Sequence, residues 1–205
     1  MEPVANSLTA DLRGVKTHRL MVRATHWINT IAFIGLVISG VAILLAHPRL
    51  YWGEVGAFGS PALIELPLPL NVEQSGWGRS LHFLSAWVSV ANGLLYVVSG
   101  LLSSHFSKQM RTYDSAQRVA YLGVVFVLFP LMLATGLAMS PAIAAVIPII
   151  VLSFGGHQSA RTIHFVVTNV LVLFLILHIV MVWRTGFTKQ VRGMIVGRRD
   201  EQEQP

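Results

Sequence analysis

Four stretches of the sequence are long and apolar enough to cross a lipid bilayer, and they constrain the fold more than any other feature. They cover residues 25–46, 81–103, 119–139 and 162–184. A membrane-spanning helix needs about 20 mostly apolar residues, and in lipid its backbone polar groups must bond within the same segment. Charged residues make up 12% of the chain, against about 25% in an ordinary soluble domain. The sequence therefore predicts an all-α membrane protein: residues 1–205 as a single domain, a bundle of four transmembrane helices.

A fifth apolar stretch, residues 141–154, is too short for a span and contains Pro141 and Pro148. Those features favour an interfacial or re-entrant segment. The distribution of basic residues also favours four spans, because it then follows the positive-inside rule and places both termini in the cytoplasm. The predicted cytoplasmic residues are Arg13, Lys16, Arg19, Arg23, Lys108, Arg111, Arg118, Arg184, Lys189, Arg192, Arg198 and Arg199, and those on the far side are Arg49, Arg79 and Arg161. Topology thus accounts for the net charge of +6, and no nucleic-acid partner is indicated.

Four histidines lie near the ends of the predicted spans. His26 begins the first span and His178 lies toward the same, cytoplasmic, side of the fourth. His82 begins the second span and His164 the fourth, both toward the far side. Fourteen residues separate His164 from His178, which advances a helix by roughly 21 Å and leaves the two on nearly the same face. One helix therefore offers one imidazole to each of two stacked sites.

Two neutral imidazoles from different helices, with no acidic residue inside the spans, are the ligands of bis-histidine haem b. Helix bundles bind such cofactors in their interior, and coordination offsets the cost of placing imidazole in lipid. The chain has no cysteine, so the haem would be non-covalent. Arg79 and Arg161 each lie one turn outward from a histidine and are candidates to pair with a haem propionate. The glycines that either admit the macrocycle or serve helix packing are Gly35, Gly40, Gly93, Gly100 and Gly136.

Other uses of the histidines remain open at this point. A single membrane histidine is often a packing residue with a hydrogen bond. Zinc needs three or four ligands at one point, whereas these histidines come in two separated pairs. Proton and cation transporters usually carry Asp or Glu within the membrane, and the predicted spans have neither. A haem-free transporter or membrane anchor is the remaining alternative, and it predicts colourless protein.

A long loop, residues 47–79, joins the first two spans on the far side. Loops of this length without regular structure are usually functional or disordered. Its tryptophans either anchor it in the interfacial aromatic belt or contribute to docking of a partner protein.

The motifs His26–Trp27 and Leu81–Phe83 (LHF), and the spacing of His164 and His178, resemble the bacterial membrane cytochromes b of the cytochrome b561 and hydrogenase-type b superfamily. The superfamily includes the gamma subunit of formate dehydrogenase and the b subunit of thiosulfate reductase. The resemblance implies a diheme bundle in the bacterial inner membrane. It also implies that His26 and His178 bind the cytoplasmic-side haem, and His82 and His164 the periplasmic-side haem.

The resemblance further implies electron transfer between the quinone pool and a periplasmic redox partner, an iron–sulfur or molybdenum subunit of a respiratory oxidoreductase. A self-sufficient superoxide:quinone oxidoreductase of the same family is the alternative, with Arg79 and Arg161 lining a positive entrance. Formate dehydrogenase-like members contact quinone through an asparagine and a glycine near the third span, and here only Gly123 is available. Other candidate polar contacts are Tyr113, Asp114, Gln117 and Arg118.

Overall fold

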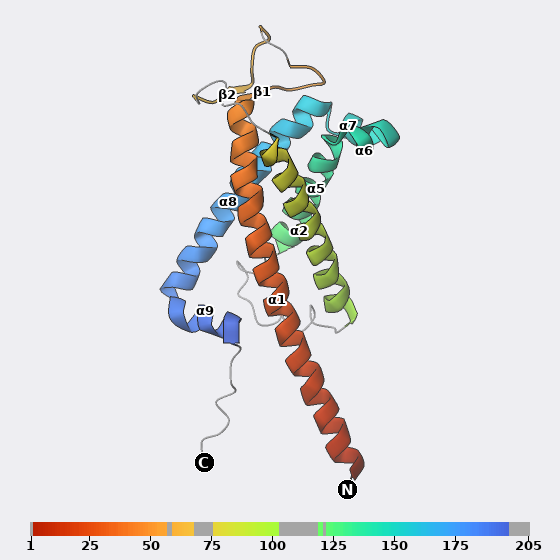
Figure 1. The fold of residues 1–205 in the computed structure, drawn as a ribbon, viewed down its shortest axis with the longest axis vertical. Helices are drawn as coiled ribbons and strands as arrows, with labels where there is room; N and C mark the ends of the chain where they lie inside the picture. Colours follow the sequence, from red (N-terminus) through yellow and green to blue (C-terminus); the bar gives the residue numbers. More distant parts are fainter. Residues whose placement is uncertain (1, 57–58, 68–75, 103–118, 121, 197–205) are drawn as a thin grey trace. The chain divides into compact units, whose positions relative to one another are not determined.

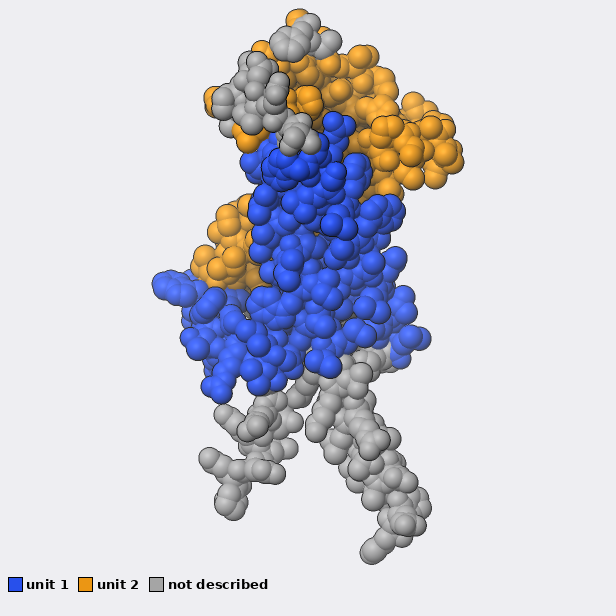
Figure 2. Space-filling model, viewed as in Figure 1, with its two compact units in different colours: residues 1–43, 74–111, 182–205 blue, residues 44–73, 112–181 orange. Residues whose placement is uncertain are grey.

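The computed structural model describes residues 2–56, 59–67, 76–102, 119–120 and 122–196, the side chains of residues 2–19 excepted. Its elements are drawn in Figure 1. The chain divides into two compact units, coloured separately in Figure 2: residues 1–43, 74–111 and 182–205 form the first, and residues 44–73 and 112–181 the second. The functional residues are therefore described unit by unit.

Two long antiparallel helices make up most of the first unit. Helix α1 is Glu2–Ala46 and helix α2 is Trp77–Leu102. The buried residues of α1 recur every seven positions, and those of α2 do nearly the same; they are Thr25, Ala32 and Ser39 on α1 and Gly78, Ser85, Asn92 and Gly100 on α2. These are small or polar residues, which suits a membrane, where lipid tails are as apolar as leucine and close backbone approach drives helix association.

Contacts between α1 and α2 follow that stripe. The Asn92 amide nitrogen donates to the Thr25 carbonyl at 2.8 Å. Farther along, a Cβ built on Gly35 would lie 2.6 Å from the Ser85 hydroxyl oxygen, so only glycine permits this approach. The first unit ends with helix α9, Phe187–Val196.

The second unit contains several shorter helices and most of one long helix, up to Met181. In chain order these are the π-helix η1 (Val124–Leu128), α5 (Phe129–Ala138), α6 (Pro141–Val146), α7 (Pro148–Ser153) and α8 (His157–Arg184). A small core of Ala138, Val151 and Ala160 joins α5, α7 and α8. Pro130 has no backbone N–H and cannot continue the α-helical ladder, which explains why the π-helical turn lies directly before it.

The far-side loop contains a two-stranded antiparallel hairpin. Strand β1, Arg49–Leu50, pairs with β2, Ile64–Glu65, with Arg49 opposite Glu65. The two side chains form an ion pair at 2.9 Å, and the hydrogen bond that Arg49 donates to Glu65 raises the pKa of Arg49 above its ordinary value. Part of the predicted loop thus has regular structure.

Three helices in the described part of the chain are long and apolar enough to cross a membrane: Leu20–Ala46, Trp77–Leu102 and His157–Arg184. They correspond to the first, second and fourth predicted spans. In the region of the third, the structure describes a shorter apolar helix, Val124–Ala138, so the count of four spans stays a prediction. The segment predicted to be interfacial forms α6 and α7, each beginning with a proline.

Candidate functional site

In the first unit, His82 on α2 is hydrogen-bonded to α1. Its Nδ1 lies 3.0 Å from the Ser39 hydroxyl oxygen. Ser39 is completely buried, and its hydroxyl lies 2.6 Å from the Gly35 carbonyl oxygen and 3.1 Å from that of Leu36. A Cβ built on the next residue, Gly40, would lie 3.7 Å from His82 Cε1. A serine–glycine pair on α1 therefore faces the edge of the imidazole.

The direction of this hydrogen bond follows from counting protons. A serine hydroxyl has one hydrogen to donate, and in Ser39 the backbone carbonyls of the preceding turn take it. With its hydrogen donated there, the hydroxyl oxygen is available to accept an N–H from Nδ1 of His82, 3.0 Å away. In that tautomer the lone pair of the ring is on Nε2, the form in which a neutral imidazole binds a metal.

In the second unit, His164 on α8 has the same surroundings, supplied by α5. Its Nδ1 lies 2.9 Å from the Thr135 hydroxyl oxygen. Thr135 is fully buried and donates to the carbonyls of Leu131, at 2.8 Å, and Met132, at 3.0 Å. A Cβ built on Gly136 would lie 3.6 Å from His164 Cε1. The Thr135 hydroxyl oxygen is thus available to accept an N–H from Nδ1 of His164, the arrangement that leaves the lone pair of the ring on Nε2.

The Nε2 atoms of His82 and His164 are suited to bind the iron of a haem. Each half-buried histidine has a hydroxyl beside Nδ1 and keeps Nε2 for a metal, and a hydrogen bond on the opposite nitrogen orients metal-binding histidines. The part of the chain that the structure describes holds no group of three or more histidine, cysteine or acidic side chains that could bind a metal ion. Zinc, which needs such a group, fits these residues poorly.

His26 and His178 have different surroundings. Both side chains are exposed, and each lies against an aromatic ring. His26 meets the adjacent Trp27 edge-on, with ring centres 5.5 Å apart, whereas His178 stacks on Phe174 one turn earlier, at 6.2 Å. Each histidine is thus accompanied by an aromatic residue of its own helix.

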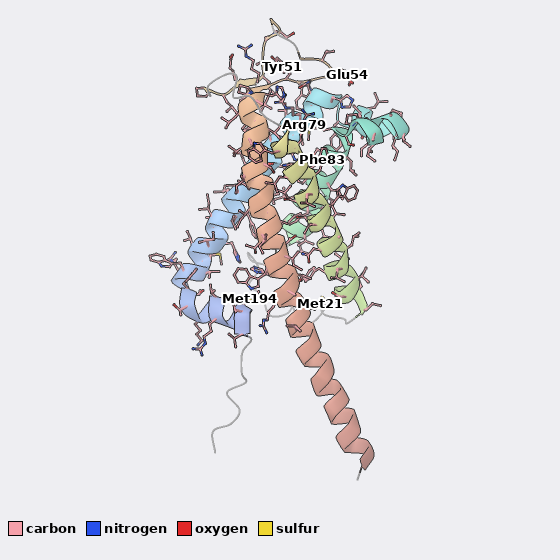
Figure 3. All side chains as sticks on the ribbon, in the orientation of Figure 1. Met21, Tyr51, Glu54, Arg79, Phe83 and Met194 are labelled. Carbon is pink, nitrogen blue, oxygen red and sulfur yellow. The ribbon has the colours of Figure 1, made fainter. Side chains whose placement is uncertain are left out.

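The turn of α1 that carries His26 also binds α9. Arg23 donates from Nε to the Met194 carbonyl at 3.1 Å and from its other nitrogen to that of Ile195. The Trp27 indole donates to the Met194 carbonyl at 3.2 Å. Carbonyls in the last turn of a helix have no partner within it, so Arg23 and Trp27 cap α9. Figure 3 labels Met21 and Met194 at this end of the unit.

The two predicted propionate partners differ in the structure. Arg79 is exposed at the start of α2. Arg161 is half-buried on α8 and donates to the carbonyl of His47, at the beginning of the far-side loop. Arg161 therefore binds the loop backbone in addition to any role toward a cofactor.

The far-side loop is fastened to the N-terminus of α8, one turn from His164. The Gly53 carbonyl accepts from the backbone N–H groups of Gln158, at 3.0 Å, and Ser159, at 3.2 Å, donors that a helix leaves without a partner in its first turn. The Ser159 hydroxyl in turn accepts from Gly53 N–H at 2.7 Å, and Thr162 donates to the Tyr51 carbonyl at 2.6 Å. Tyr51 and Glu54 of this loop are labelled in Figure 3.

A family model described as prokaryotic cytochrome b561 matches residues 17–197. The chain belongs to the prokaryotic cytochrome b561 family. The predicted family is thereby confirmed, and with it a membrane protein that binds b-type haem. A relative from Azospira oryzae, named "Putative protein-methionine-sulfoxide reductase subunit YedZ1", is 26% identical over 193 residues, which cover 80% of this chain and 89% of the relative. No solved structure matches the chain significantly.

Sequence reasoning on this cytochrome b561 protein missed Ser39 and Thr135. A signal was present, because each precedes a glycine within an apolar stretch, in ISGVA and ATGLA. Only the glycines were considered. The candidate quinone contacts Tyr113, Asp114, Gln117 and Arg118 lie outside the described residues.

Proposed function

We propose that this protein is a diheme cytochrome b of the bacterial inner membrane, which carries electrons between the quinone pool and a periplasmic redox enzyme. The observation that carries this proposal is the pair of histidines whose Nδ1 atoms lie within hydrogen-bond distance of buried hydroxyls, at 3.0 and 2.9 Å. Members of the prokaryotic cytochrome b561 family bind b-type haem. We therefore set aside the alternative of a haem-free transporter.

Each proposed ligand set pairs two histidines that lie toward the same side of the membrane. His82 and His164 bind the haem on the far side, and His26 and His178 bind the haem on the cytoplasmic side. A b-type haem held by these histidines would supply one-electron transfer chemistry. The protein contributes neutral, oriented ligands and a low-polarity surround, which favour electron transfer over chemistry at the iron.

The proposed orientation places both termini in the cytoplasm. The basic residues of α9 and of the segment before it, Arg184, Lys189 and Arg192, then lie on the cytoplasmic side, as the positive-inside rule expects. The far-side loop faces the periplasm in this arrangement. The loop is hydrogen-bonded to Ser159 and Thr162 of α8, which precede His164 by five and two residues. A partner bound to the loop would therefore lie near His164.

A periplasmic oxidoreductase subunit is the proposed partner of that loop. The Azospira relative is named as a subunit of a reductase, which supports a multi-subunit role for this chain. Trp52, Val55 and Leu63 of the loop are exposed, so apolar side chains are available there for contact with a partner. Quinone or quinol is the proposed substrate on the membrane side.

The first test is the absorption spectrum of the purified protein, reduced with dithionite minus oxidised in air, with haem extracted and counted per chain. Two non-covalent b haems with low-spin bands are expected. A folded preparation with one haem would contradict the paired ligand sets, and a colourless one would contradict the function. Co-purification of a periplasmic redox enzyme, lost on deleting residues 51–65, would test the partner.

A further inference from the structure

The same constellation occurs twice, on two separate pairs of antiparallel helices. In each, a hydroxyl residue followed by glycine on one helix faces a histidine on the other: Ser39 and Gly40 face His82, and Thr135 and Gly136 face His164. The distances agree to 0.1 Å: 3.0 and 2.9 Å from hydroxyl to Nδ1, and 3.7 and 3.6 Å from the built Cβ to Cε1. The helix pairs belong to different units of the chain.

Packing alone explains neither element of this constellation. The hydroxyl groups do not need the histidines, because their hydrogens are donated within their own helices. The histidines do not need the glycines, because a Cβ at Gly40 or Gly136 would make only an ordinary van der Waals contact with the ring and would meet no other described atom within 4 Å. Gly35 is different, since its Cβ would collide with Ser85. Gly35 serves helix packing, whereas Gly40 and Gly136 leave room beside an oriented imidazole.

We propose that Ser39 and Thr135 are positioning residues that fix the two histidines of the far-side haem, and that Gly40 and Gly136 make room for the edge of the macrocycle. This inference rests on the proposed function, because it takes His82 and His164 as ligands. It gives α5, which carries no histidine, a share of the haem site. It also assigns a neutral hydroxyl as the hydrogen-bond acceptor of each ligand, in place of the carboxylate or carbonyl that often serves metal-bound histidines.

The hydroxyl should have two measurable effects. It holds the ring in one tautomer and orientation, so the ligand needs no reorganisation when it binds iron. It also increases electron donation from the imidazole by accepting Nδ1–H, which stabilises the oxidised, more positive iron. Removing the hydroxyl should therefore weaken haem binding and raise the midpoint potential of the far-side haem alone.

The experiment compares Ser39→Ala, Thr135→Val and Thr135→Ser with the parent protein, each purified as the full chain. Haem retention, a redox titration followed by absorption, and the electron paramagnetic resonance g values of the low-spin haems are measured. Ser39→Ala and Thr135→Val should retain the far-side haem about 10- to 100-fold less tightly and raise its potential. Thr135→Ser keeps the hydroxyl and should match the parent.

Several outcomes distinguish this inference from the proposed function. If the parent binds two haems and Ser39→Ala and Thr135→Val leave retention, potentials and g values unchanged, the positioning role is wrong and the function stands. If the parent binds no haem, both fail. If Ser39→Ala does not fold, the valine and serine variants at position 135 decide the question, since valine matches threonine in shape and lacks only the hydroxyl.

The glycines are tested by Gly40→Ala and Gly136→Ala, with Gly93→Ala on α2 as the matched control. No described atom lies within 4 Å of a Cβ at Gly93. The first two should lower the content of far-side haem without changing the helical circular dichroism of the haem-depleted protein, and the control should change neither. Full haem content with unchanged spectra in both variants would overturn the proposal that these glycines make room for the macrocycle.

Discussion

His82 and His164 differ from His26 and His178 in how the protein holds them. The first two are half-buried, and each is bound through Nδ1 to a buried hydroxyl on a neighbouring helix. The second two are exposed and lie against an aromatic ring of their own helix. The comparison teaches that a buried hydroxyl on a neighbouring helix orients His82 and His164, whereas the aromatic rings beside His26 and His178 come from the same helix as the histidine.

The largest expected effect comes from removing a ligand. His82→Ala and His164→Ala should each abolish the same haem, and His26→Ala and His178→Ala should each abolish the other, because a haem with one axial imidazole loses half its coordination to the protein. Extracted haem per chain should fall from two to one, and the two pairs of variants should lose different components of the redox titration.

His157→Ala is the control for this set, since His157 lies 3.8 Å from Glu54 on the surface and is not a proposed ligand. It should retain both haems. If His164→Ala still bound two haems, or if His82→Ala and His164→Ala removed different components, the pairing of ligands would be wrong.

A smaller effect is expected from separating the far-side loop from α8. Gly156 has φ of +115° and a Cβ built on it would lie 2.5 Å from the Gly53 backbone. Gly156→Ala should therefore cost about 2–4 kcal/mol of stability and disturb the haem next to His164, but not the one next to His178. Thermal unfolding in detergent and the redox titration measure the two effects.

Gly59→Ala, in the far-side loop itself, is the matched control. Gly59 also has a positive φ, +94°, but meets no described atom within 4 Å, so its substitution should cost only about 1 kcal/mol of backbone strain. Equal losses in the two variants would mean that the contact with Gly53 contributes nothing.

The smallest effect is expected near His26, where α1 binds α9. Arg23→Ala removes the charged donor that caps α9, which should cost about 1–2 kcal/mol and leave α9 less firmly bound to α1. Trypsin should then cut more quickly at Lys189 and Arg192 in native membranes. Arg23→Lys, which keeps the charge but not the forked donors, should lie in between. Cleavage at the parent's rate in Arg23→Ala would show that Trp27 alone holds the helix.

Much of the fold could be read from the sequence because hydrophobic length is a local property. The apolar stretches at 25–46, 81–103 and 162–184 correspond to helices long enough to span a membrane, and the family inferred from the histidine pattern is confirmed. In the stretch at 119–139 the described residues include a shorter apolar helix, Val124–Ala138, so a span there stays a prediction.

The sequence by itself determined that the chain is a membrane protein with histidines near the ends of its spans, since composition and spacing suffice for both. Only the tertiary structure decided which hydroxyls orient His82 and His164 and where the far-side loop is fastened. Ser39 and His82 are 43 positions apart, Thr135 and His164 are 29, and Gly53 and Ser159 are 106. A hydrogen bond depends on distance and angle in space, and periodicity along one helix carries no information about the residue that faces it on another.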